Sequence, residues 1–415
     1  MPYSAMNPHL LDFKSVQLEP FVHQVGGHSG FFHINNETLC KPLVDREHFF
    51  YENLPANLKE FIPEYRGEIV VQMIEDTDGY VTLVGYPTEY SSGILNSKKC
   101  SSCTYNSNSP TMDSMCDTSA DKVSCLENQH ANSNSLDPHR HRPLQSRIIE
   151  DTTKSEQQSP TEEHDAIGGI NPWSLKCHKQ TLSRMKKNTG LNSYKFILLE
   201  NVAAQFYFPC ILDLKMGTRQ HGDDATEEKK KRHTRKCQST TSSSIGVRVC
   251  GMQVHQVDTG RYICHNKYYG RSLTVEGFKL ELLQFLHNGC TSRIDLVTPI
   301  IHRLLKLQDA IERRDSFRFY SSSLLIMYEG STSLVNEASL QAINKDDPKN
   351  HSVSVSSENI DVRMIDFAHS THQGFSGDKT VHKGPDKGYL FGLKNLVQAF
   401  IDIKKWYSEN ETSRP

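Results

Sequence analysis

An acid and a base stand two positions apart at Asp213 and Lys215, directly after an apolar run over 206–212 that predicts a buried strand. Because side chains alternate along a strand, Asp213 and Lys215 would project from the same face of the sheet. A buried charged pair costs desolvation free energy unless a polar group occupies it. Gly217 then permits a turn where a bulkier residue would obstruct a ligand. The pattern indicates either a ligand-binding strand or a salt bridge that closes a sheet.

Another acid, Asp366, follows an apolar pair at the end of a strand predicted over 361–365. A bare carboxylate in such a place is costly unless it holds a cation. We expect Asp366 to bind Mg²⁺ with the help of Ser323, from the antiparallel partner strand predicted over 318–328. The Ile-Asp-Phe sequence is similar to the Asp-Phe-Gly magnesium motif of protein kinases, with Ala368 in place of the glycine.

The N-terminal part predicts two short strands, over 21–25 and 31–34, around a glycine turn. Lys41 follows one strand later, and Glu52 lies in the next predicted helix. A glycine turn, a lysine and a helix glutamate in this order are typical of the kinase lobe that holds nucleotide phosphates. We therefore assign Lys41 to the phosphates of ATP, with Glu52 as its partner. Glycine hairpins followed by an ordinary exposed lysine are common, so the pattern is weak by itself.

A charged segment over 224–236 predicts a helix. Asp224 and Glu227 form a capping box, and acids precede bases by four positions, so a solvated surface helix is one sufficient explanation. A nucleic-acid patch is a second interpretation, but the segment lacks interleaved aromatic residues for base stacking, and we expect no nucleic acid. In a third interpretation, one basic face binds a highly phosphorylated ligand. The residues of that face are Lys215, Arg219, His221, Lys229, Arg232, His233 and Lys236.

The chain has 415 residues, a formal net charge of −2 and a mean hydropathy of −0.57. No global field therefore attracts an anion, and a polyphosphate site requires local clustering of bases. No apolar run approaches the ~20 residues of a membrane span, and the N-terminus lacks the features of a signal peptide. We expect a soluble protein of the cytoplasm and nucleus whose 11 scattered cysteines are reduced. Cys100 and Cys103 have a metal-like spacing but no second half-site, so we predict no structural zinc.

Pro209, Asp213, Lys215 and Gly217 form the pattern P-x-x-x-D-x-K-x-G, which resembles the signature of the inositol polyphosphate kinase family. The longer string over 212–224 resembles the inositol hexakisphosphate kinase branch of that family. Further matches lie at 18–28, 321–325, 364–369 and 384–392. The resemblance implies an α+β fold with two kinase-like lobes, an antiparallel sheet in each lobe and ATP in the cleft between them.

Composition and the resemblance together divide the chain. Residues 88–167 are rich in Ser and Asn, lack aliphatic periodicity and are too long for an ordinary connection, so we predict a disordered insert. We predict a second disordered insert over 330–359 and a disordered N-terminus over 1–15. The N-lobe is then expected over 16–87 and 168–203, ending in a hinge. The C-lobe is expected over 204–329, with the catalytic and inositol-phosphate elements, and over 360–412, with the metal-binding strand and the C-terminal helix.

The resemblance also implies roles for single residues. It implies that the backbone around Glu200 and Val202 forms an adenine-binding hinge. It places Asp213 near the ATP ribose and the reacting end, as an anchor or a base, and Lys215 on the inositol ligand and the transferring group. The implied catalytic residues are Asp213 and Lys215, and the implied ATP-binding residues are Lys41, Glu52, Glu200, Val202, Asp213 and Asp366.

The implied activity is ATP-dependent phosphorylation of inositol hexakisphosphate, with Mg²⁺, at position 5. Since that acceptor group is a phosphate already ionised at pH 7, it needs little base catalysis. One alternative is a kinase of less phosphorylated inositols. Another is a non-catalytic inositol-phosphate scaffold, against which the presence of Lys41, Asp213, Lys215 and Asp366 argues. The chain lacks a His-Arg-Asp catalytic loop, which separates it from the usual protein kinases. We expect any protein partners to bind the inserts.

Overall fold

The computed structural model describes residues 14–88, 146–147, 170–187, 193–331, 360–375, 378 and 380–411. Most of both predicted inserts and residues 1–13 of the predicted N-terminal segment lie outside this part of the chain, as do Cys100 and Cys103. The cysteines within the described ranges form no disulfide bond with one another. None of the helices in the described ranges is both long enough and apolar enough to cross a lipid bilayer.

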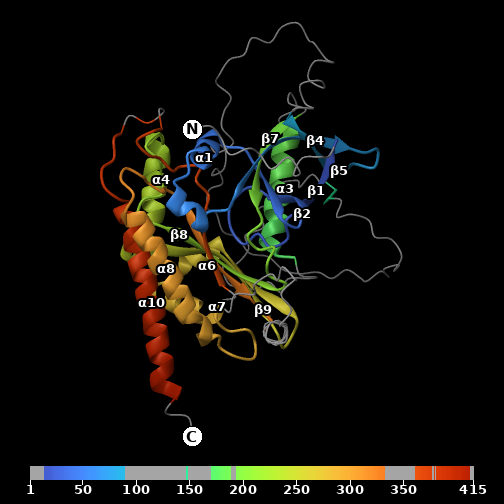
Figure 1. Cartoon of the computed structure of the whole chain (residues 1–415). Helices are drawn as coiled ribbons and strands as arrows, with labels where there is room; N and C mark the ends of the chain where they lie inside the picture. The colour runs from blue at the N-terminus through green and yellow to red at the C-terminus, as the bar shows by residue number, and fades with distance from the viewer. Residues whose placement is uncertain are drawn as a thin grey trace, which may run out of the picture.

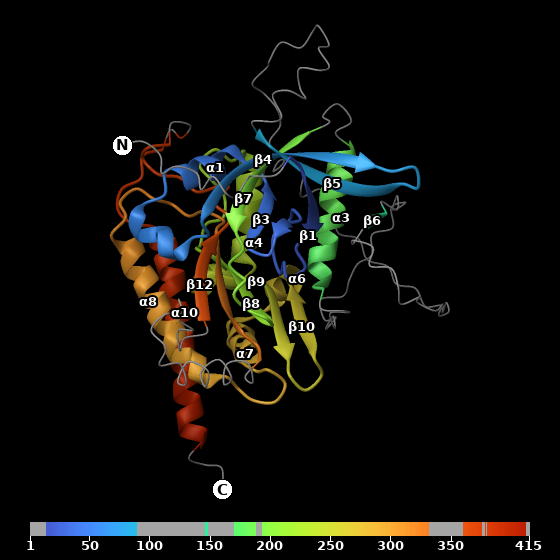
Figure 2. The ribbon, with the colours of Figure 1, turned by 45° about the vertical axis from the view of Figure 1, so that its right-hand side comes forward.

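The N-lobe is built on an antiparallel sheet in the order β1-β2-β3-β7-β4-β5-β6. β1 also pairs with β5, so the longer strands close on themselves. The strands are β1 (Val16–Pro20), β2 (Phe32–Asn35), β3 (Thr38–Pro42), β4 (Tyr65–Glu75), β5 (Tyr80–Pro87), β6 (Ser146–Arg147) and β7 (Tyr194–Glu200). Their inward side chains pack with Leu182 and Met185 of α3 (Pro172–Lys187), which lies along this sheet in Figures 1 and 2. This small apolar core holds the N-lobe together.

The C-lobe is built on a second antiparallel sheet in the order β10-β9-β8-β11-β12. The strands are β8 (Pro209–Met216), β9 (Val247–Gln256), β10 (Arg261–Asn266), β11 (Ser323–Glu329) and β12 (Ile360–Ile365). The strand predicted over 206–212 forms only in its later part: β8 begins at Pro209 and is buried along nearly its whole length, whereas Tyr207 and Phe208 before it are exposed. β8 lies in the centre of the sheet, and ladders on both sides therefore hold Asp213 and Lys215 in place.

Three long helices cover the C-lobe core: α7 (Val275–Phe285), α8 (Val297–Glu312) and α10 (Lys387–Glu411). α8 and α10 lie side by side in Figures 1 and 2. The apolar stripes predicted for α7 and α8 are buried, with Phe278 and Leu304 among their most enclosed residues. The remaining helical elements are α1 (Asp45–Glu52), η2 (Ala56–Phe61), α4 (Glu227–Gln238), α5 (Thr241–Ile245), α6 (Lys267–Ser272) and η6 (Ile294–Leu296). The predicted α+β fold with an antiparallel sheet in each of two lobes is confirmed.

The segment over 21–25 is not the predicted strand. The Gln24 side chain donates to the carbonyls of Gly26 at 2.9 Å and Ser29 at 2.8 Å, and it accepts from the Phe31 amide at 3.0 Å. These bonds shape a loop and replace a ladder, so the first strand, β1, lies before it. The strand predicted over 318–328 likewise begins later, at Ser323.

Two helices begin at other residues than predicted. α10 begins at Lys387 rather than Gly392, because the Asp386 carboxylate accepts from the Tyr389 amide at 3.0 Å. α4 begins with Thr226 as its N-cap, so the capping box predicted for Asp224 is wrong. The Asp224 carboxylate instead lies 3.4 Å from the Arg46 guanidinium.

Candidate functional site

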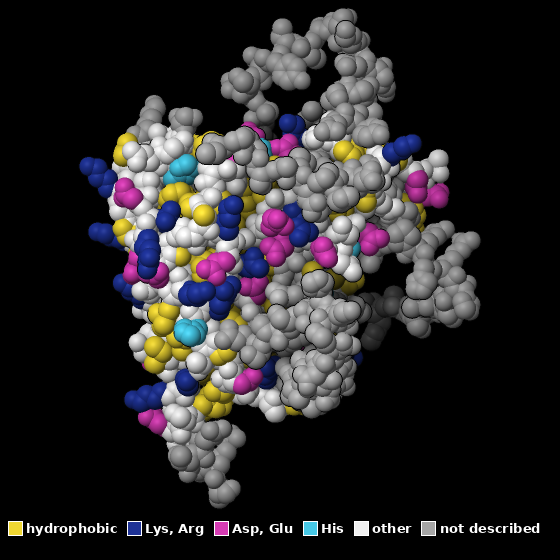
Figure 3. Space-filling model, viewed as in Figure 1, with side chains coloured by type: hydrophobic (Ala, Val, Ile, Leu, Met, Phe, Trp, Pro, Cys, Tyr) yellow, Lys and Arg dark blue, Asp and Glu magenta, His cyan; other side chains and the backbone are white. Residues whose placement is uncertain are grey.

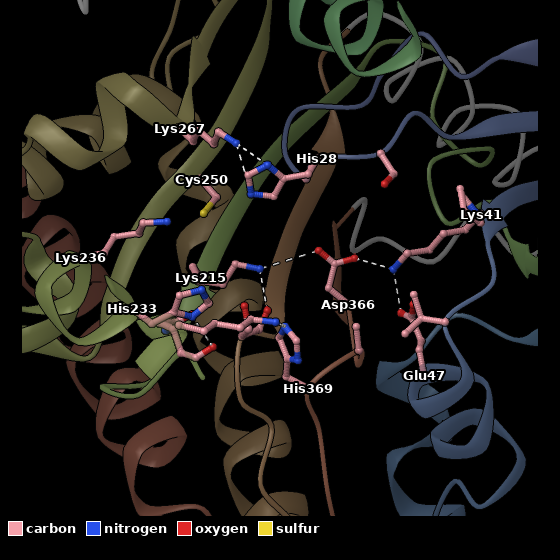
Figure 4. A pocket seen from close by; sticks show the side chains of 18 of the residues that line it. His28, Lys41, Glu47, Lys215, His233, Lys236, Cys250, Lys267, Asp366 and His369 are labelled. Carbon is pink, nitrogen blue, oxygen red and sulfur yellow. Dashed lines mark hydrogen bonds and ion pairs between the residues drawn. The ribbon is translucent and has the colours of Figure 1, made fainter. Parts of the chain in front are cut away.

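Four charged side chains meet between the lobes. Lys41 Nζ, from β3, lies 2.7 Å from Glu47 Oε1 of α1 and 2.7 Å from Asp366 Oδ1. Lys215 Nζ, from β8, lies 3.8 Å from Asp366 Oδ2 and donates to the Ser321 carbonyl at 2.7 Å. Figure 4 shows Asp366 between the two lysines. One carboxylate thus joins a lysine of the N-lobe to a lysine of the C-lobe.

Lys41 and Asp366 each stabilise the charged form of the other. Burial opposes ionisation of Asp366, but Lys41 and Lys215 more than offset it, so the pKa of Asp366 lies well below its ordinary value. Burial also disfavours the Lys41 ammonium, yet Asp366 and Glu47 hold the pKa of Lys41 above its usual range. Burial raises the pKa of Glu47, which Lys41 and the Phe367 amide, at 3.0 Å, partly oppose. Lys41 and Asp366 are therefore charged at pH 7.

The glutamate that pairs with Lys41 is Glu47, and the prediction of Glu52 is wrong. Glu52 lies at the other end of α1, where its carboxylate is 3.5 Å from His48 Nε2. Five residues of helix rotate a side chain by about 140° from the starting direction, so the two glutamates cannot face the same lysine. Both glutamates fit the sequence pattern, and only the docking of α1 distinguishes them.

An apolar slot lies on one side of the Lys41–Asp366 pair, between the two sheets. Its walls include residues of the hinge and apolar side chains of both lobes: Phe21, Val25, Leu39, Leu199, Val202, Ala203, Ile211, Leu325, Met327 and Ile365. Glu200 also borders the slot, but its carboxylate accepts from Arg363 at 3.2 Å and from the Glu64 amide at 3.0 Å. The Glu200 side chain therefore links the hinge to β12 through Arg363. A slot of this lining suits a flat aromatic group.

The glycine turn closes this slot over Asp213. A Cβ atom on Gly26 would lie 1.9 Å from Asp213 Oδ2, so any other residue there would have to displace the Asp213 carboxylate. Gly27 has a φ of +84°, which glycine adopts without strain. On the opposite side of the turn, a Cβ on Gly251 of β9 would lie 1.9 Å from the Val25 carbonyl oxygen. The turn is therefore held tightly against the C-lobe sheet.

Asp213 is 2% exposed, and burial, offset in part by Lys215, raises its pKa to about 6. The register places Ser323 opposite Lys215 on β11, one strand from Asp366. The Ser323 hydroxyl lies beside Asp213 without normal hydrogen-bond geometry, and among the described residues neither Ser323 Oγ nor Asp213 Oδ1 has a hydrogen-bond partner. These buried oxygens, with Asp366, are the ligand type that hard divalent cations prefer.

Within the described ranges, no group of three or more His, Cys, Asp or Glu side chains could hold a metal ion. Mg²⁺ in kinases is usually bound by one or two carboxylates together with substrate phosphates, so two carboxylates and a hydroxyl fit it.

A basic pocket lies on the other side of the Lys41–Asp366 pair and shares Gly27, Phe31, Lys41 and Asp366 with the slot. Among the described residues that line it, the only acids are Glu47 and Asp366. Its other lysines and arginines come from five elements of the fold: Lys215 of β8, Arg248 of β9, Arg184 of α3, Lys229, Arg232 and Lys236 of α4, and Lys267 and Arg271 of α6. Three histidines, His28, His233 and His369, also line it. The predicted Lys215, Lys229, Arg232 and Lys236 therefore line one cavity, which a polyanion would suit.

The Asp213-x-Lys215 spacing spans the two cavities. Asp213 borders the apolar slot, and Lys215 borders the basic pocket. Because Asp213 and Lys215 are two positions apart along β8, their side chains leave the same face and their Cα atoms are about 7 Å apart. One central strand thus supplies one charged group to each cavity.

Lys267 shows the excess of positive charge in the basic pocket. Its Nζ lies 2.8 Å from His28 Nδ1 and 4.9 Å from the centre of the Trp173 ring, and Figure 4 shows it above Lys215. Burial and the nearby Arg271 lower the pKa of Lys267 to about 8. A bound anion would favour the charged form of this side chain.

The structure does not bring Arg219 and His221 into the basic pocket, so the expectation that they join Lys215 there is wrong. The chain turns after β8 at Gly217, which has a φ of +87°. Arg219 then stacks on the Tyr320 ring at 4.2 Å and pairs with Asp223 at 2.6 Å, and it borders a separate cavity. His221 Nδ1 lies 3.3 Å from Arg219 Nε.

Sequence reasoning missed His28, Arg184, Arg248, Lys267 and Arg271 as pocket residues. The spacing of Lys267 and Arg271, four apart, places both on one face of a helix and was a usable signal. Arg248 reaches the site through the register, since it lies opposite Lys215 on β9. No local pattern shows such a pairing.

The face of the molecule in Figure 3 shows Lys and Arg interspersed with Asp and Glu over the C-lobe. This face carries no broad surface of one charge. The clustering that a polyanion requires is found in the pocket beside Asp366.

Comparisons with known proteins place the chain among inositol phosphate kinases. The family model described as "Inositol polyphosphate kinase" matches residues 196–401. The chain is 44% identical to inositol hexakisphosphate kinase 1 of Rattus norvegicus, over 94% of each chain. It is 43% and 41% identical to inositol hexakisphosphate kinases 2 and 3 of Homo sapiens, over 94% of this chain and 96% of each relative. A solved structure of the inositol phosphate multikinase of S. cerevisiae with ADP and Mn²⁺ is 28% identical. It covers 52% of this chain and 85% of its own, at a TM-score of 0.42, too low to support an argument.

Proposed function

The chain belongs to the inositol polyphosphate kinase family, within its inositol hexakisphosphate kinase branch, and on this premise we propose that it transfers the γ-phosphate of ATP to a phosphate of inositol hexakisphosphate. The observation that carries the proposal is the meeting of two unlike cavities at Asp366, an apolar slot beside a hinge and a basic pocket. A nucleotide in the slot would present its terminal phosphate to an acceptor in the pocket.

The slot suits ATP by its lining. Val202 and the apolar side chains around it would enclose the adenine, while Gly26 and Gly27 let the backbone approach the phosphates closely. Lys41 is charged and fixed by Glu47, so it can neutralise phosphate oxygens without reorganising. Asp213, which borders the same slot, is placed to anchor the ribose or to help hold a cation.

The basic pocket suits a highly phosphorylated inositol better than a lightly phosphorylated one. Its bases approach from β8, β9, α3, α4 and α6, so phosphates around a whole ring would find partners on several sides. This distribution favours the hexakisphosphate over the alternative of a less phosphorylated acceptor. The family resemblance supports position 5 as the acceptor and diphosphoinositol pentakisphosphate as the product.

The transfer requires positioning and charge neutralisation more than a strong base. An oxygen of the acceptor phosphate forms a bond to the γ-phosphorus as the bond from that phosphorus to the β–γ bridging oxygen breaks, and ADP leaves with the electron pair. Since the acceptor oxygen is already ionised at pH 7, no proton has to be removed. Lys215, 3.8 Å from Asp366, would bind the transferring group between the two substrates.

A divalent cation fits beside this group, and we propose Mg²⁺. Asp366 would hold it, with Ser323 and the free oxygen of Asp213 close by. When bound, such a cation neutralises charge on the β- and γ-phosphates.

The test is to incubate the purified chain with ATP, Mg²⁺ and each inositol phosphate in turn, and to separate products by charge. We expect a product more charged than inositol hexakisphosphate, with no comparable turnover of the lower inositol phosphates. Lys215→Ala should lower kcat strongly, because Lys215 lies at the transferring end. A wild-type chain that binds both ligands without turnover would contradict the proposal and favour the scaffold.

A further inference from the structure

Helix α1 is attached to the segment that follows Asp366 by most of its length. Glu47 accepts from the Phe367 amide at 3.0 Å, and Phe50 stacks on the Phe367 ring at 4.1 Å. Further along the segment, Phe49 stacks on His372, at 5.8 Å between ring centres. The glutamate that fixes Lys41 is therefore held in place by the same segment that begins with Asp366.

Arg46 adds an ion pair to these attachments. Its guanidinium forms a two-pronged bond to the Asp378 carboxylate, at 2.7 and 2.9 Å, and it stacks on the Phe375 ring at 4.0 Å. Arg46 and Asp378 are nearly enclosed, with side-chain exposures of 10% and 3%. Thr371 also donates to the Asp378 carboxylate, which fixes the acid from the other side. A forked bond of this kind fixes the direction of both groups as well as their distance.

The same guanidinium also contacts the loop that leads into α4, the helix that lines the basic pocket. Arg46 lies 3.4 Å from Asp224, three residues before α4, which carries Lys229 and Lys236. The neighbouring Asp223 pairs with His382 at 2.6 Å. Arg46 therefore contacts both the segment after the expected cation ligand and the loop that precedes α4.

We propose that Arg46 is a positioning residue that sets α1, and with it Lys41 and Glu47, relative to Asp366 and α4. It touches neither cavity, so its action on the reaction runs through the residues that it holds. The kinetic part of this proposal rests on the function proposed above. Its structural part, the fixing of the Phe367 amide by α1, does not.

The test substitutes Arg46→Met, which retains length and removes the fork, and Arg46→Lys, which retains the charge. We expect Arg46→Met to lower kcat by about tenfold or more while KM for ATP changes less than threefold, with partial recovery in Arg46→Lys. Combined with Glu47→Gln, Arg46→Met should add little further loss, because both changes disturb one unit. The Phe367 amide should exchange hydrogen about tenfold faster in Arg46→Met than in the wild type.

Arg293→Met is the matched control. Arg293 is also nearly buried, forks onto the carboxylate of Asp295 at 2.8 Å and lies over the Tyr328 ring, but it lines neither cavity. The Arg293→Met variant should have a lower melting temperature, with kcat and the hydrogen exchange of the Phe367 amide unchanged. If Arg46→Met equals Arg293→Met in these readouts, or its loss simply adds to that of Glu47→Gln, Arg46 is only a structural ion pair. A chain without kinase activity would refute the proposed function, and Phe367 exchange would still decide the role of Arg46.

Discussion

The apolar slot and the basic pocket share the Lys41–Asp366 pair but differ in the chemistry of their linings. The slot is lined by the hinge and by apolar side chains of both lobes, so the affinity of a ligand there would depend on burial of apolar surface. The pocket is lined by bases from several elements around Lys215, so the affinity of a ligand there would depend on charge and would be screened by salt. Raising the ionic strength should therefore weaken binding in the pocket far more than binding in the slot.

The two acids that border the slot, Asp213 and Asp366, have pKa shifts of opposite direction. Asp366, between two lysines, is stabilised as an anion, whereas Asp213, under the glycine turn, is buried with less compensation. The difference shows that burial alone does not decide the charge of a group. The number of opposite charges at bonding distance decides it.

The largest expected effect follows removal of the Asp366 carboxylate, which borders both cavities. Asp366→Asn should lower kcat by about 10³-fold or more, because it removes the expected cation ligand and leaves Lys41 and Lys215 without their common partner. Turnover with Mg²⁺ and a circular dichroism spectrum check this. Asp402→Asn, an exposed acid on α10 that pairs with Lys279, is the control and should leave kcat unchanged. Near-normal turnover of Asp366→Asn would remove Asp366 from the site.

A smaller effect, of opposite sign for the two acids, is expected on stability. Because the pKa of folded Asp213 is raised to about 6, its charge penalises the folded state at pH 7. Asp213→Asn should therefore raise the free energy of unfolding of the ligand-free protein by roughly 1–3 kcal/mol at pH 7, and this gain should shrink as the pH falls from about 6 to about 4. Denaturant titrations at pH 7 and pH 4.5 measure it.

Asp366→Asn should instead destabilise the protein at pH 7, since the pKa of Asp366 is lowered and its charge favours folding. If both substitutions shift stability in the same direction, the contrast between the two acids is wrong.

The smallest expected effect separates the two sets of bases near β8. Lys236→Met should raise KM for inositol hexakisphosphate about tenfold at low salt, less at high salt, and leave KM for ATP unchanged. Arg219→Met should change KM for the inositol phosphate less than twofold, because Arg219 borders a different cavity. Initial rates at two ionic strengths suffice. A larger effect of Arg219 than of Lys236 would show that the acceptor lies outside the basic pocket.

Much of the fold was predictable because its signals are local. The apolar run before Asp213 predicted β8, and the periodic stripes of α7 and α8 predicted buried helices, since alternation and helical periodicity are properties of neighbouring residues. Asp213 and Lys215 were placed on one face for the same reason. The resemblance of the motifs then implied two kinase-like lobes, which the two antiparallel sheets confirm.

What the sequence by itself determined, then, is the set of charged residues and the strands and helices that carry them. The tertiary structure alone decided which of them meet. The docking of α1 places Glu47, and not Glu52, beside Lys41. The turn at Gly217 directs Arg219 to Tyr320, outside the basic pocket. The strand register places Arg248 opposite Lys215. The physical reason is that local pattern specifies the direction of a side chain within its own element. The position of that element relative to others depends on contacts between residues far apart in the chain, which no short stretch contains.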